Sequence, residues 1–300
     1  MIYYYDEIPK LKDTIVTIGK FDGIHKGHMK LVNEALKQKK ETGYAIVMFE
    51  LRINENLCLL NEEEKRNIAE DNGIDYMISY PLDDYIKNMT PDEFLNNILK
   101  EKLGTKAVIV GDDFRFGINR AKGADYIKEM QEVYGYKTVI ISKLKMLMEN
   151  NKEEIISSTL IKEYLLSGEV LAANKMLGRK YAVKGKIIHG KQLGRTIGFP
   201  TINVELDEKK ILPANGVYKV YVIIDGKRYL GMADIGNKPT VGEGFKTGLE
   251  VNIFDFNEDV YNKEATVLFC DFIRKEKKFS NVEELQYQLG NDKKHILSIY

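Results

Sequence analysis

The sequence has little cysteine and no excess of charge of either sign. Its two cysteines, Cys58 and Cys270, lie far apart in apolar surroundings, so we expect a reducing compartment and neither a disulfide nor a zinc site. The formal net charge is zero, from 45 basic and 45 acidic residues, and such a balance shows no general nucleic-acid-binding surface. We therefore expect no nucleic-acid partner.

Long apolar runs are also missing. No run approaches the roughly 20 residues that a helix needs to cross a bilayer, and residues 1–6 lack the basic and apolar regions of a signal peptide. The expected protein is soluble and cytoplasmic, without a membrane partner. The chain of 300 residues is longer than a typical single core, and this length favours two domains.

The most informative segment is GKFDGIHKGH over residues 19–28. It follows an apolar, β-branched run at residues 14–18 that predicts a buried strand, and apolar residues at helical spacing come after it. A turn between a strand and a helix offers backbone N–H groups and the positive end of the helix dipole to anions. Gly23 and Gly27 would allow a phosphate to approach the backbone closely. The turn therefore suits a nucleoside triphosphate.

Two other interpretations of the histidine pair in this turn are open. His25 and His28 could bind a metal, although no third histidine and no cysteine lies nearby, or they could be structural residues of the core. The dinucleotide fingerprint G-x-G-x-x-G and the phosphate loop G-x-x-x-x-G-K-[ST] do not occur. The segment is similar to the His-x-Gly-His signature of nucleotidylyltransferases.

The first half of the chain alternates short apolar strands with helical patterns. A helix is predicted over residues 91–103, with Thr90 as N-cap, Glu93 completing a capping box and Gly104 ending it. The predicted strands cover residues 14–18, 44–49, 76–80, 107–110 and 138–141. This alternation predicts a Rossmann-like α/β domain with a parallel sheet, in which ligands bind at the carboxyl ends of the strands. The histidine turn and the segment GDDFRFG at residues 111–117 would then face one crevice.

The second half, from about residue 178 onward, has the pattern of consecutive strands. The predicted strands cover residues 217–224, 228–233, 249–254 and 265–272. The first two form a hairpin around Asp225 and Gly226, and a last helix is expected to begin at Ser280, with Glu283 completing a capping box. These patterns predict a small antiparallel β-barrel with a terminal helix, although a sandwich would have the same pattern.

Several segments, in this order, resemble the bacterial bifunctional riboflavin kinase/FAD synthetase family. They cover residues 19–28, 111–117, 156–162, 190–203, 213–218, 235–240, 249–256 and 274–279. The resemblance implies an FMN adenylyltransferase domain over residues 1–180 and a riboflavin kinase domain over residues 181–300. Riboflavin, FMN, FAD, ATP, ADP and pyrophosphate are the implied substrates and products. Mg²⁺ would accompany ATP, no tightly bound prosthetic group is implied, and the oligomeric state is not predicted.

For the second half, the resemblance implies ATP-dependent phosphorylation of the riboflavin 5′-hydroxyl. Glu250 is the candidate general base: residues 249, 251 and 253 share one strand face, so Glu250 lies on the other. This pattern by itself favours a solvated carboxylate, whereas the resemblance favours a base. The resemblance also assigns Thr201 to Mg²⁺ and Arg274 to flavin binding, and three glycines spaced by four would form a mobile loop over phosphates. The implied ATP and phosphate contacts are Gly190, Gly194, Arg195, Gly198, Pro200 and Asn203.

For the first half, the resemblance implies attack of the FMN phosphate on the α-phosphorus of ATP, with pyrophosphate leaving. His25 and His28 are the implied catalytic residues, which would stabilise phosphate charge beside a helix N-terminus. The implied ATP and phosphate contacts are Gly19, Phe21, Asp22, Gly27, Ser158, Thr159 and Lys162, although a plain N-cap would also account for Ser158 and Thr159. The implied flavin contacts are Asp113, Phe114 and Arg115, to which we add Arg52 as a candidate for the flavin phosphate.

The first half departs from the family pattern at three places. Leu51, Arg52 and Ile53 stand where the family carries Pro-His-Pro in a flavin-binding loop. Lys162 stands where arginine is usual, which keeps the charge but loses the bidentate fork, and Lys20 stands where a smaller or neutral residue is usual. A riboflavin kinase alone, with a degenerate or repurposed first domain, is therefore an alternative function. A regulatory protein that binds flavin or nucleotide without either activity is a second one, and nucleotidyl transfer to a different phosphorylated metabolite is a third.

Overall fold

The computed structural model of the chain describes residues 2–4, 8–52, 57–81, 88–148, 151–190, 193–239 and 245–299. The polypeptide forms two compact units, Met1–Ser158 and Thr159–Tyr300, which are described separately below. Ile53, residues 191–192 and Thr240, which belong to the motifs above, lie outside the described residues. Within the described ranges, every helix is too short or too polar to span a membrane.

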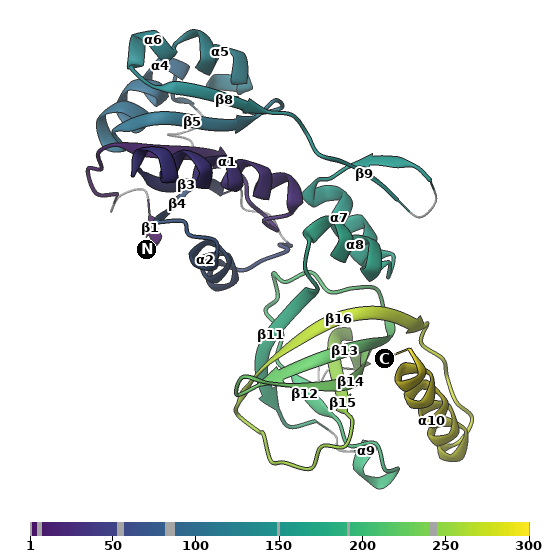
Figure 1. Cartoon of the computed structure of the whole chain (residues 1–300). Coiled ribbons are helices and arrows are strands. Elements are labelled where there is room, and N and C mark those ends of the chain that lie inside the picture. The colour runs from purple at the N-terminus through teal and green to yellow at the C-terminus, as the bar shows by residue number, and fades with distance from the viewer. Residues whose placement is uncertain are drawn as a thin grey trace. The chain divides into compact units, whose positions relative to one another are not determined.

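The first unit is built on a parallel sheet whose described strands run in the order β1–β4–β3–β2–β5–β8 (Figure 1). These strands are β1 (Ile2–Tyr4), β2 (Thr14–Gly19), β3 (Ala45–Arg52), β4 (Tyr76–Pro81), β5 (Thr105–Gly111) and β8 (Lys137–Ile141). The five predicted strands are confirmed, with boundaries that shift by a few residues. The sequence pattern does not predict β1, because three residues are too few to show a period.

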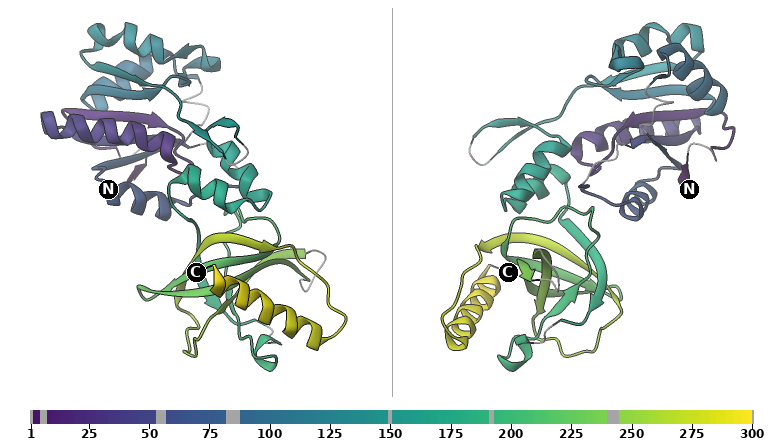
Figure 2. Two further views of the ribbon diagram at one scale, coloured as in Figure 1. Left: turned by 45° about the vertical axis from the view of Figure 1, so that its right-hand side comes forward. Right: turned by 180° about the vertical axis from the view of Figure 1, so that it is seen from behind.

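Helices cover both faces of this sheet, as the two views in Figure 2 show. The chain steps from β2 through β3 to β4 in one direction, and α1 (Lys26–Thr42) and α2 (Glu62–Asp71) lie in the two crossovers. It then returns to β5 and β8 on the other side of β2, so right-handed crossovers place the later helices on the opposite face. These are α4 (Pro91–Glu93), η1 (Phe94–Lys102), α5 (Ala124–Glu129) and α6 (Gln131–Tyr134). The strand order reverses between β2 and β5, and ligands of such sheets bind at this point.

The alternation of side chains along the strands divides the apolar core into two layers. Ile15 and Met48 point to one face, where they pack with residues of α1 and α2 such as Val32 and Ala69. Their chain neighbours Val16, Val47 and Phe49 point to the other face and pack with η1 and α5. A sheet that is buried on both faces requires apolar residues at consecutive positions, which explains the apolar runs of the sequence.

The helix predicted over residues 91–103 is present, but its body is a π-helix. The capping box is confirmed, because the Thr90 N–H donates to Glu93 Oε2 at 2.8 Å and the Glu93 N–H donates to Thr90 Oγ1 at 3.2 Å. From Phe94 to Lys102 the backbone winds more widely, and at its end the Leu103 N–H donates to the Ile98 carbonyl at 3.0 Å. Over so short a stretch, the spacing of apolar residues does not separate the α period from the π period.

The first unit also contains two short ribbons of paired strands. One follows β5 and pairs β6 (Arg115–Phe116) with β7 (Lys122–Gly123), on either side of the 3₁₀ turn η2 (Ile118–Arg120). The other follows β8 and pairs β9 (Lys145–Leu147) with β10 (Glu153–Ile155). The first ribbon holds part of the GDDFRFG segment, so this predicted site segment has a defined backbone.

The second unit is a closed antiparallel barrel whose described strands follow the order β11–β12–β15–β14–β13–β16 (Figure 1). Pairing of β16 with β11 closes the sheet and decides between the barrel and the sandwich. The strands are β11 (Tyr181–Ile188), β12 (Ile202–Val204), β13 (Gly216–Ile224), β14 (Lys227–Pro239), β15 (Phe245–Ile253) and β16 (Glu264–Arg274). The helices α7 (Ser158–Leu166) and α8 (Val170–Leu177) precede the barrel, and the short α9 (Leu193–Thr196) lies between β11 and β12.

The predicted hairpin turn of the barrel is confirmed, whereas the predicted cap of the last helix is not. The predicted hairpin turn at Asp225 and Gly226 is confirmed, and both residues have positive φ, 48° and 75°, as a tight hairpin requires. The last helix, α10 (Val282–Ser298), packs on the barrel through Ile296.

The cap predicted for the last helix, Ser280 with Glu283, is wrong by one residue. Asn281 is the N-cap, and its side chain accepts a hydrogen bond from the Glu284 N–H at 2.8 Å. Ser280 instead donates its backbone N–H to the Glu284 carboxylate at 3.1 Å. Ser280 and Asn281 each stand three positions before a glutamate, so the capping pattern occurs twice in overlap. Only the backbone conformation, which is extended at Asn281, decides that Asn281 is the N-cap.

Candidate active sites

The histidine turn connects β2 to α1, and His25 is the N-cap of that helix. Nδ1 of His25 accepts a hydrogen bond from the His28 N–H at 3.3 Å, so this nitrogen carries no proton in the capped form and Nε2 carries the hydrogen. The two imidazole rings stack, with centroids 3.8 Å apart. A Cβ at Gly27 would lie 3.0 Å from Cε1 of His25, so glycine at this position lets the His25 ring lie over the first turn.

His28 is held as a neutral imidazole. Burial of its ring, and secondarily electrostatic interaction with His25 and Lys65, place the pKa of His28 well below its ordinary value. A neutral ring donates a hydrogen bond but adds no full positive charge, so the favourable field for a phosphate comes from the N-terminus of α1 as well. The Phe21 ring lies beside His28, with centroids 5.0 Å apart. Phe21 itself is fully buried, so any contact between Phe21 and ATP would come from its backbone.

Asp22 joins three segments that are far apart in the sequence. Its Oδ1 accepts a hydrogen bond from the Leu59 N–H at 2.8 Å, and its backbone carbonyl accepts one from the Ser158 hydroxyl at 3.3 Å. The histidine turn is thereby attached to the segment before α2 and to the first residue of α7. Thr159 and Lys162 lie further along α7, in the second unit. These contacts account for Asp22 and Ser158 as structural residues of the turn, and their predicted contacts with ATP stay predictions.

The segment after β5 reaches the same sheet edge as the histidine turn, because β2 and β5 pair in parallel register. Phe114 stacks on Phe116, with centroids 5.6 Å apart, and the Arg115 guanidinium donates to the Phe114 carbonyl at 2.9 Å. Asp113 pairs with Lys143 beyond β8 at 3.1 Å. The structure thus brings the histidine turn and the GDDFRFG segment to one edge of the sheet. The aromatic pair and the charged residues lie in the segment that follows β5.

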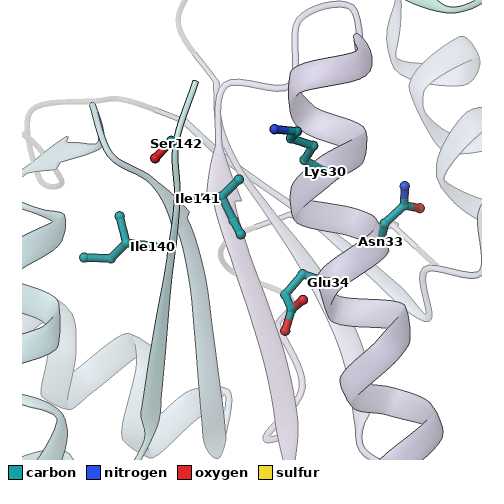
Figure 3. Close-up of a pocket in the computed structure, with 6 residues that line it drawn as sticks. All are labelled: Lys30, Asn33, Glu34, Ile140, Ile141 and Ser142. Carbon is teal, nitrogen blue, oxygen red and sulfur yellow. The ribbon is translucent and has the colours of Figure 1, made fainter. Parts of the chain in front are cut away.

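A hollow of about 420 Å³ lies beside the first turns of α1 (Figure 3). Lys30 and Glu34 of α1 extend toward Ile141 and Ser142 at the end of β8 (Figure 3). The remaining lining residues are Asn33 and Ile140. The hollow is wide open to solvent, unlike the enclosed clefts that hold small molecules. The sequence predicts none of these six residues as a site residue. Lys30 and Glu34 have the pattern of a solvated helix face, and only the packing of α1 on the sheet places them opposite β8.

Two residues at the end of β3, where the chain departs from the family pattern, have partners in the structure. Arg52 forms an ion pair with Glu62 in the first turn of α2, at 2.7 Å. Its side chain is about one third exposed, so it lies at the surface rather than in the core. Glu50, two residues earlier and on the same face of β3, forms a buried ion pair with Lys65 of α2. The sequence analysis did not single out Glu50 or Lys65.

The candidate kinase site lies on the outer face of the barrel. Leu249, Val251 and Ile253 are buried on the inner face of β15, so Glu250 points outward, as predicted, and is half-buried. The Thr201 hydroxyl donates to Glu250 Oε2 at 3.2 Å. Asn203 of β12 is the cross-strand partner of Glu250 on one side, so the structure brings three predicted residues together.

Asp234 is a member of this face that the sequence analysis missed. It lies on β14, directly opposite Glu250 on the other side of β15, and cross-strand partners project from the same face of a sheet. The only sequence signal is the polar residue between the apolar Ala233 and Ile235, which many exposed strands share. Among the described residues, no group of three or more His, Cys, Asp or Glu side chains is arranged to hold a metal.

The described residues between β11 and β12, 189–190 and 193–201, pack closely on this face. A Cβ at Gly190 would lie 2.2 Å from the Asn203 side-chain nitrogen, so only glycine leaves room for that amide. Gly194 accepts the Phe199 N–H at 2.8 Å, and Gly198 has a φ of 78°. The Pro200 carbonyl accepts a hydrogen bond from the Asn252 amide at 2.7 Å. Gly190 therefore leaves room for the Asn203 side chain, and Gly194 and Gly198 shape the turn that leads to β12.

Arg195 and Arg274, which are predicted to bind phosphate and flavin, both contact other side chains of the second unit. Arg195 of α9 donates to the Tyr261 hydroxyl at 3.1 Å, and His189 stacks on the same tyrosine ring, with centroids 3.6 Å apart. Arg274 forms an ion pair with the buried Asp292 of α10, through Nε at 2.9 Å and Nη2 at 2.8 Å. Arg274 therefore attaches the last helix to the end of β16, and its predicted contact with the flavin stays a prediction.

Comparisons with known proteins agree with this arrangement. The family model described as FAD synthetase matches residues 7–160, and the model described as riboflavin kinase matches residues 177–300. A bifunctional riboflavin kinase/FMN adenylyltransferase of Buchnera aphidicola subsp. Schizaphis graminum is 35% identical over 292 residues, which are 93% of this chain and 92% of the relative. The protein of the same description from Escherichia coli K12 is 33% identical over 288 residues, 93% of this chain and 90% of the relative.

A solved structure resembles the whole chain. It is a Streptococcus pneumoniae protein described as a macrolide-efflux protein, with a TM-score of 0.87 and 31% sequence identity, covering 98% of this chain and 97% of that one. The alternative of a kinase alone is not supported, because the FAD synthetase model matches the first half and the relatives above are bifunctional. The chain belongs to the family of bifunctional riboflavin kinase/FMN adenylyltransferases.

Proposed function

We propose that the outer face of β15 is the riboflavin kinase site and that the turn between β2 and α1 is the adenylyltransferase site. Membership of the family gives the chain both activities: phosphorylation of riboflavin to FMN by ATP, and adenylylation of FMN to FAD. The observation that carries the first assignment is the hydrogen bond from Thr201 to Glu250 beside Asn203. We place the boundary between the catalytic domains at residues 180 and 181, before β11.

In the kinase reaction, Glu250 acts as general base. Its carboxylate takes the proton of the riboflavin 5′-hydroxyl while that oxygen bonds to the γ-phosphorus of ATP. The bond from the γ-phosphorus to the bridging oxygen breaks, and ADP leaves. The hydrogen bond from Thr201 orients one carboxylate oxygen, so the base is positioned before the flavin binds. The loop that contains Gly190, Gly194 and Gly198 would hold the phosphates, with Arg195 adding positive charge.

The same residues fit a magnesium ion that is bound with ATP. A hydroxyl that donates its hydrogen to Glu250 presents its lone pairs to a cation, and the Asn203 amide supplies an oxygen of the type that Mg²⁺ prefers. Thr201 and Asn203 would provide the protein ligands, and the ATP phosphates and water the others. When bound, the ion neutralises phosphate charge as it develops.

In the adenylyltransferase reaction, His25, His28 and the N-terminus of α1 bind the ATP phosphates. A phosphate oxygen of FMN attacks the α-phosphorus, the bond to the bridging oxygen breaks, and pyrophosphate leaves. The cap fixes the hydrogen of His25 on Nε2, away from the helix, where it can donate to a phosphate oxygen. Gly27 leaves room for this ring position. No protein side chain has to change its covalent state.

The flavin would lie against the aromatic and charged residues at the same sheet edge. Phe114 offers a ring for stacking, and Asp113 and Arg115 lie next to it, while Arg52 is assigned to the FMN phosphate because it is a partly exposed cation at the end of β3. In the second unit, Arg274 is assigned to riboflavin. We further propose a cytoplasmic location, with ADP and pyrophosphate as products, no tightly bound prosthetic group and no nucleic-acid or membrane partner.

A time course of flavin conversion tests the assignment. The protein is incubated with riboflavin, ATP and Mg²⁺, and the flavins are separated by chromatography. We expect FMN to appear first and FAD to follow, and FMN as starting substrate to be converted to FAD. Accumulation of FMN without FAD under both conditions would refute the adenylyltransferase site. A parallel incubation with excess EDTA should abolish FMN formation if Mg²⁺ is required.

A further inference from the structure

The outer face of the barrel continues beyond Glu250 as a strip of sheet that carries no side chains. Gly248 lies two residues before Glu250 on β15, and Gly236 lies two residues after Asp234 on β14. The two glycines are cross-strand partners, as are Glu250 and Asp234, so all four residues share the outer face. Glycine within a strand often marks a place where another group approaches the backbone closely. Such a place lies directly beside the proposed base.

The carboxylate of Glu276 lies on this strip. A Cβ at Gly236 would overlap Glu276 Oε1, so a side chain at that position would displace the carboxylate. The Asn215 amide donates to the other oxygen, Oε2, at 3.1 Å. Asn215 directly precedes β13, and Glu276 follows the end of β16 by two residues. The two ends of neighbouring strands thus hold the carboxylate over β14.

Ion pairing does not explain where Glu276 is held. The residue is exposed, and it forms no ion pair with any residue in the part of the chain that the structure describes. Its hydrogen-bond partner, Asn215, is a neutral amide. A carboxylate has about four lone-pair sites for hydrogen bonds, so the contact with Asn215 orients the group and leaves acceptor capacity for the donors of a ligand.

The phosphate loop determines from which side the flavin reaches Glu250. Gly190 lies against the Asn203 side chain, and the Asn252 amide donates to the Pro200 carbonyl at 2.7 Å. The segment proposed to hold the ATP phosphates therefore covers the side of Glu250 that faces β12. In phosphoryl transfer the attacking and leaving oxygens lie roughly in line, on opposite sides of the phosphorus. The acceptor hydroxyl, and the chain that carries it, therefore approach across β14.

We propose that Glu276 is a specificity-determining residue of the kinase site, which accepts hydrogen bonds from the ribityl hydroxyls of riboflavin. The proposal rests on the assignment of the outer face of β15 to the kinase reaction. Gly236 and Glu250 are diagonal neighbours on the sheet, and such positions are about 7 to 8 Å apart. A five-carbon chain with bonds of about 1.5 Å spans a similar length. With the 5′-hydroxyl at Glu250, the secondary hydroxyls would lie within reach of Glu276.

The chemistry of the two groups is complementary. Each secondary hydroxyl of the ribityl chain has an O–H to donate, and an ionised carboxylate only accepts. A hydrogen bond to a charged acceptor is stronger than one between neutral groups. A site built to bind a hydroxyl in this way rejects an analogue that lacks the hydroxyl, because the polar group of the site is then left unpaired. Glu276 would therefore select a polyol chain, while Glu250 takes part in the transfer itself.

The experiment compares riboflavin with its hydroxypentyl analogue, which keeps the terminal hydroxyl and lacks the secondary ones. We measure kcat and KM for phosphorylation of each flavin by the full-length chain. The wild type should prefer riboflavin. Glu276→Ala should lower kcat/KM for riboflavin about 10- to 100-fold, the usual contribution of hydrogen bonds to a charged group, mainly through KM, and should change the value for the analogue little. Glu276→Gln keeps an acceptor oxygen and should lose less.

The controls separate recognition of the chain from loss of structure. Glu283→Ala removes another exposed carboxylate of the second unit, in α10, and should leave the constants for both flavins unchanged. The unfolding temperature and the conversion of FMN to FAD in the other domain report whether each variant is folded. An equal loss for both flavins in Glu276→Ala, or no loss for either, would overturn the proposal. Full FMN formation by Glu250→Gln would instead refute the underlying assignment of the kinase site.

Discussion

Replacing Arg274 by methionine should destabilise the second unit by about 2 to 4 kcal/mol. The guanidinium makes two contacts, of 2.9 and 2.8 Å, with Asp292 of α10. Asp292 is 4% exposed and the Arg274 side chain 20% exposed, so the pair is largely removed from water. Methionine keeps most of the side-chain volume but leaves the Asp292 carboxylate buried without its cation.

The magnitude follows from the surroundings of Asp292. Removing one partner of a buried pair costs about 3 to 5 kcal/mol, because the remaining charge is uncompensated. The loss here is smaller, because Arg274 is partly solvated and because Gln288 also donates to Asp292, at 2.8 Å. For a unit of this size, about 3 kcal/mol corresponds to a fall in the unfolding temperature of about 6 to 12 °C.

Thermal and urea unfolding of the full chain measure this effect, and Lys293→Met is the matched control. Lys293 is also on α10, but its pair with Asp255 is 3.2 Å long and the aspartate is 87% exposed, so its loss should cost less than about 1 kcal/mol. Arg274→Met/Asp292→Leu removes both buried charges and should recover most of the stability. Equal effects of Arg274→Met and Lys293→Met would refute the reasoning. A raised KM for riboflavin in the stable double variant would show the additional contact of Arg274 with the flavin.

Substitutions at three other residues test the assigned sites. Glu250→Gln should lower kcat for FMN formation by about 10²- to 10⁴-fold, the usual contribution of a general base, with conversion of FMN to FAD unchanged; an active variant would remove Glu250 as the base. His28→Ala should abolish FAD formation and spare FMN formation, whereas loss of both activities would show that the domains depend on each other. Because the folded pKa of His28 lies below the unfolded value of about 6.5, stability should be lost as the pH falls from there toward the folded pKa. His28→Gln should remove that part of the acid sensitivity in urea unfolding at pH 5 and 7. Arg52→Ala should raise KM for FMN and leave KM for ATP unchanged, and an unchanged KM for FMN would contradict its assignment to the flavin phosphate.

Much of the architecture could be predicted because it depends on local patterns. The strands of the parallel sheet have apolar residues at consecutive positions, since both faces are buried, and the capping box of Thr90 and Glu93 has its signature within four residues. The outward direction of Glu250 follows from the period of two in a strand. The error at the cap of α10 has the same origin: Ser280 and Asn281 both fit the pattern, and nothing within the pattern separates them.

The grouping of residues in the two sites depends on contacts across long stretches of chain. Asp234 reaches the face of Glu250 through pairing of β14 with β15, and register between distant strands is not encoded in either strand alone. Lys65 and Glu50 meet only because α2 packs over the end of β3. The hollow beside α1 has no sequence signal at all. Lys30 and Glu34 have the pattern of ordinary helix-surface residues, and only the fold places β8 opposite them.

The sequence by itself determined the alternation of strands and helices in the first half, the run of consecutive strands in the second half, and the family to which its motifs belong. Those features come from hydrophobic periodicity, caps and glycine turns, which act over a few residues. Only the tertiary structure decided that β16 closes the barrel on β11, that Asp22 joins the histidine turn to Leu59 and Ser158, and that Lys65 pairs with Glu50. These contacts are selected by the packing of the whole core, in which each element limits where the others can lie, so no short segment contains them.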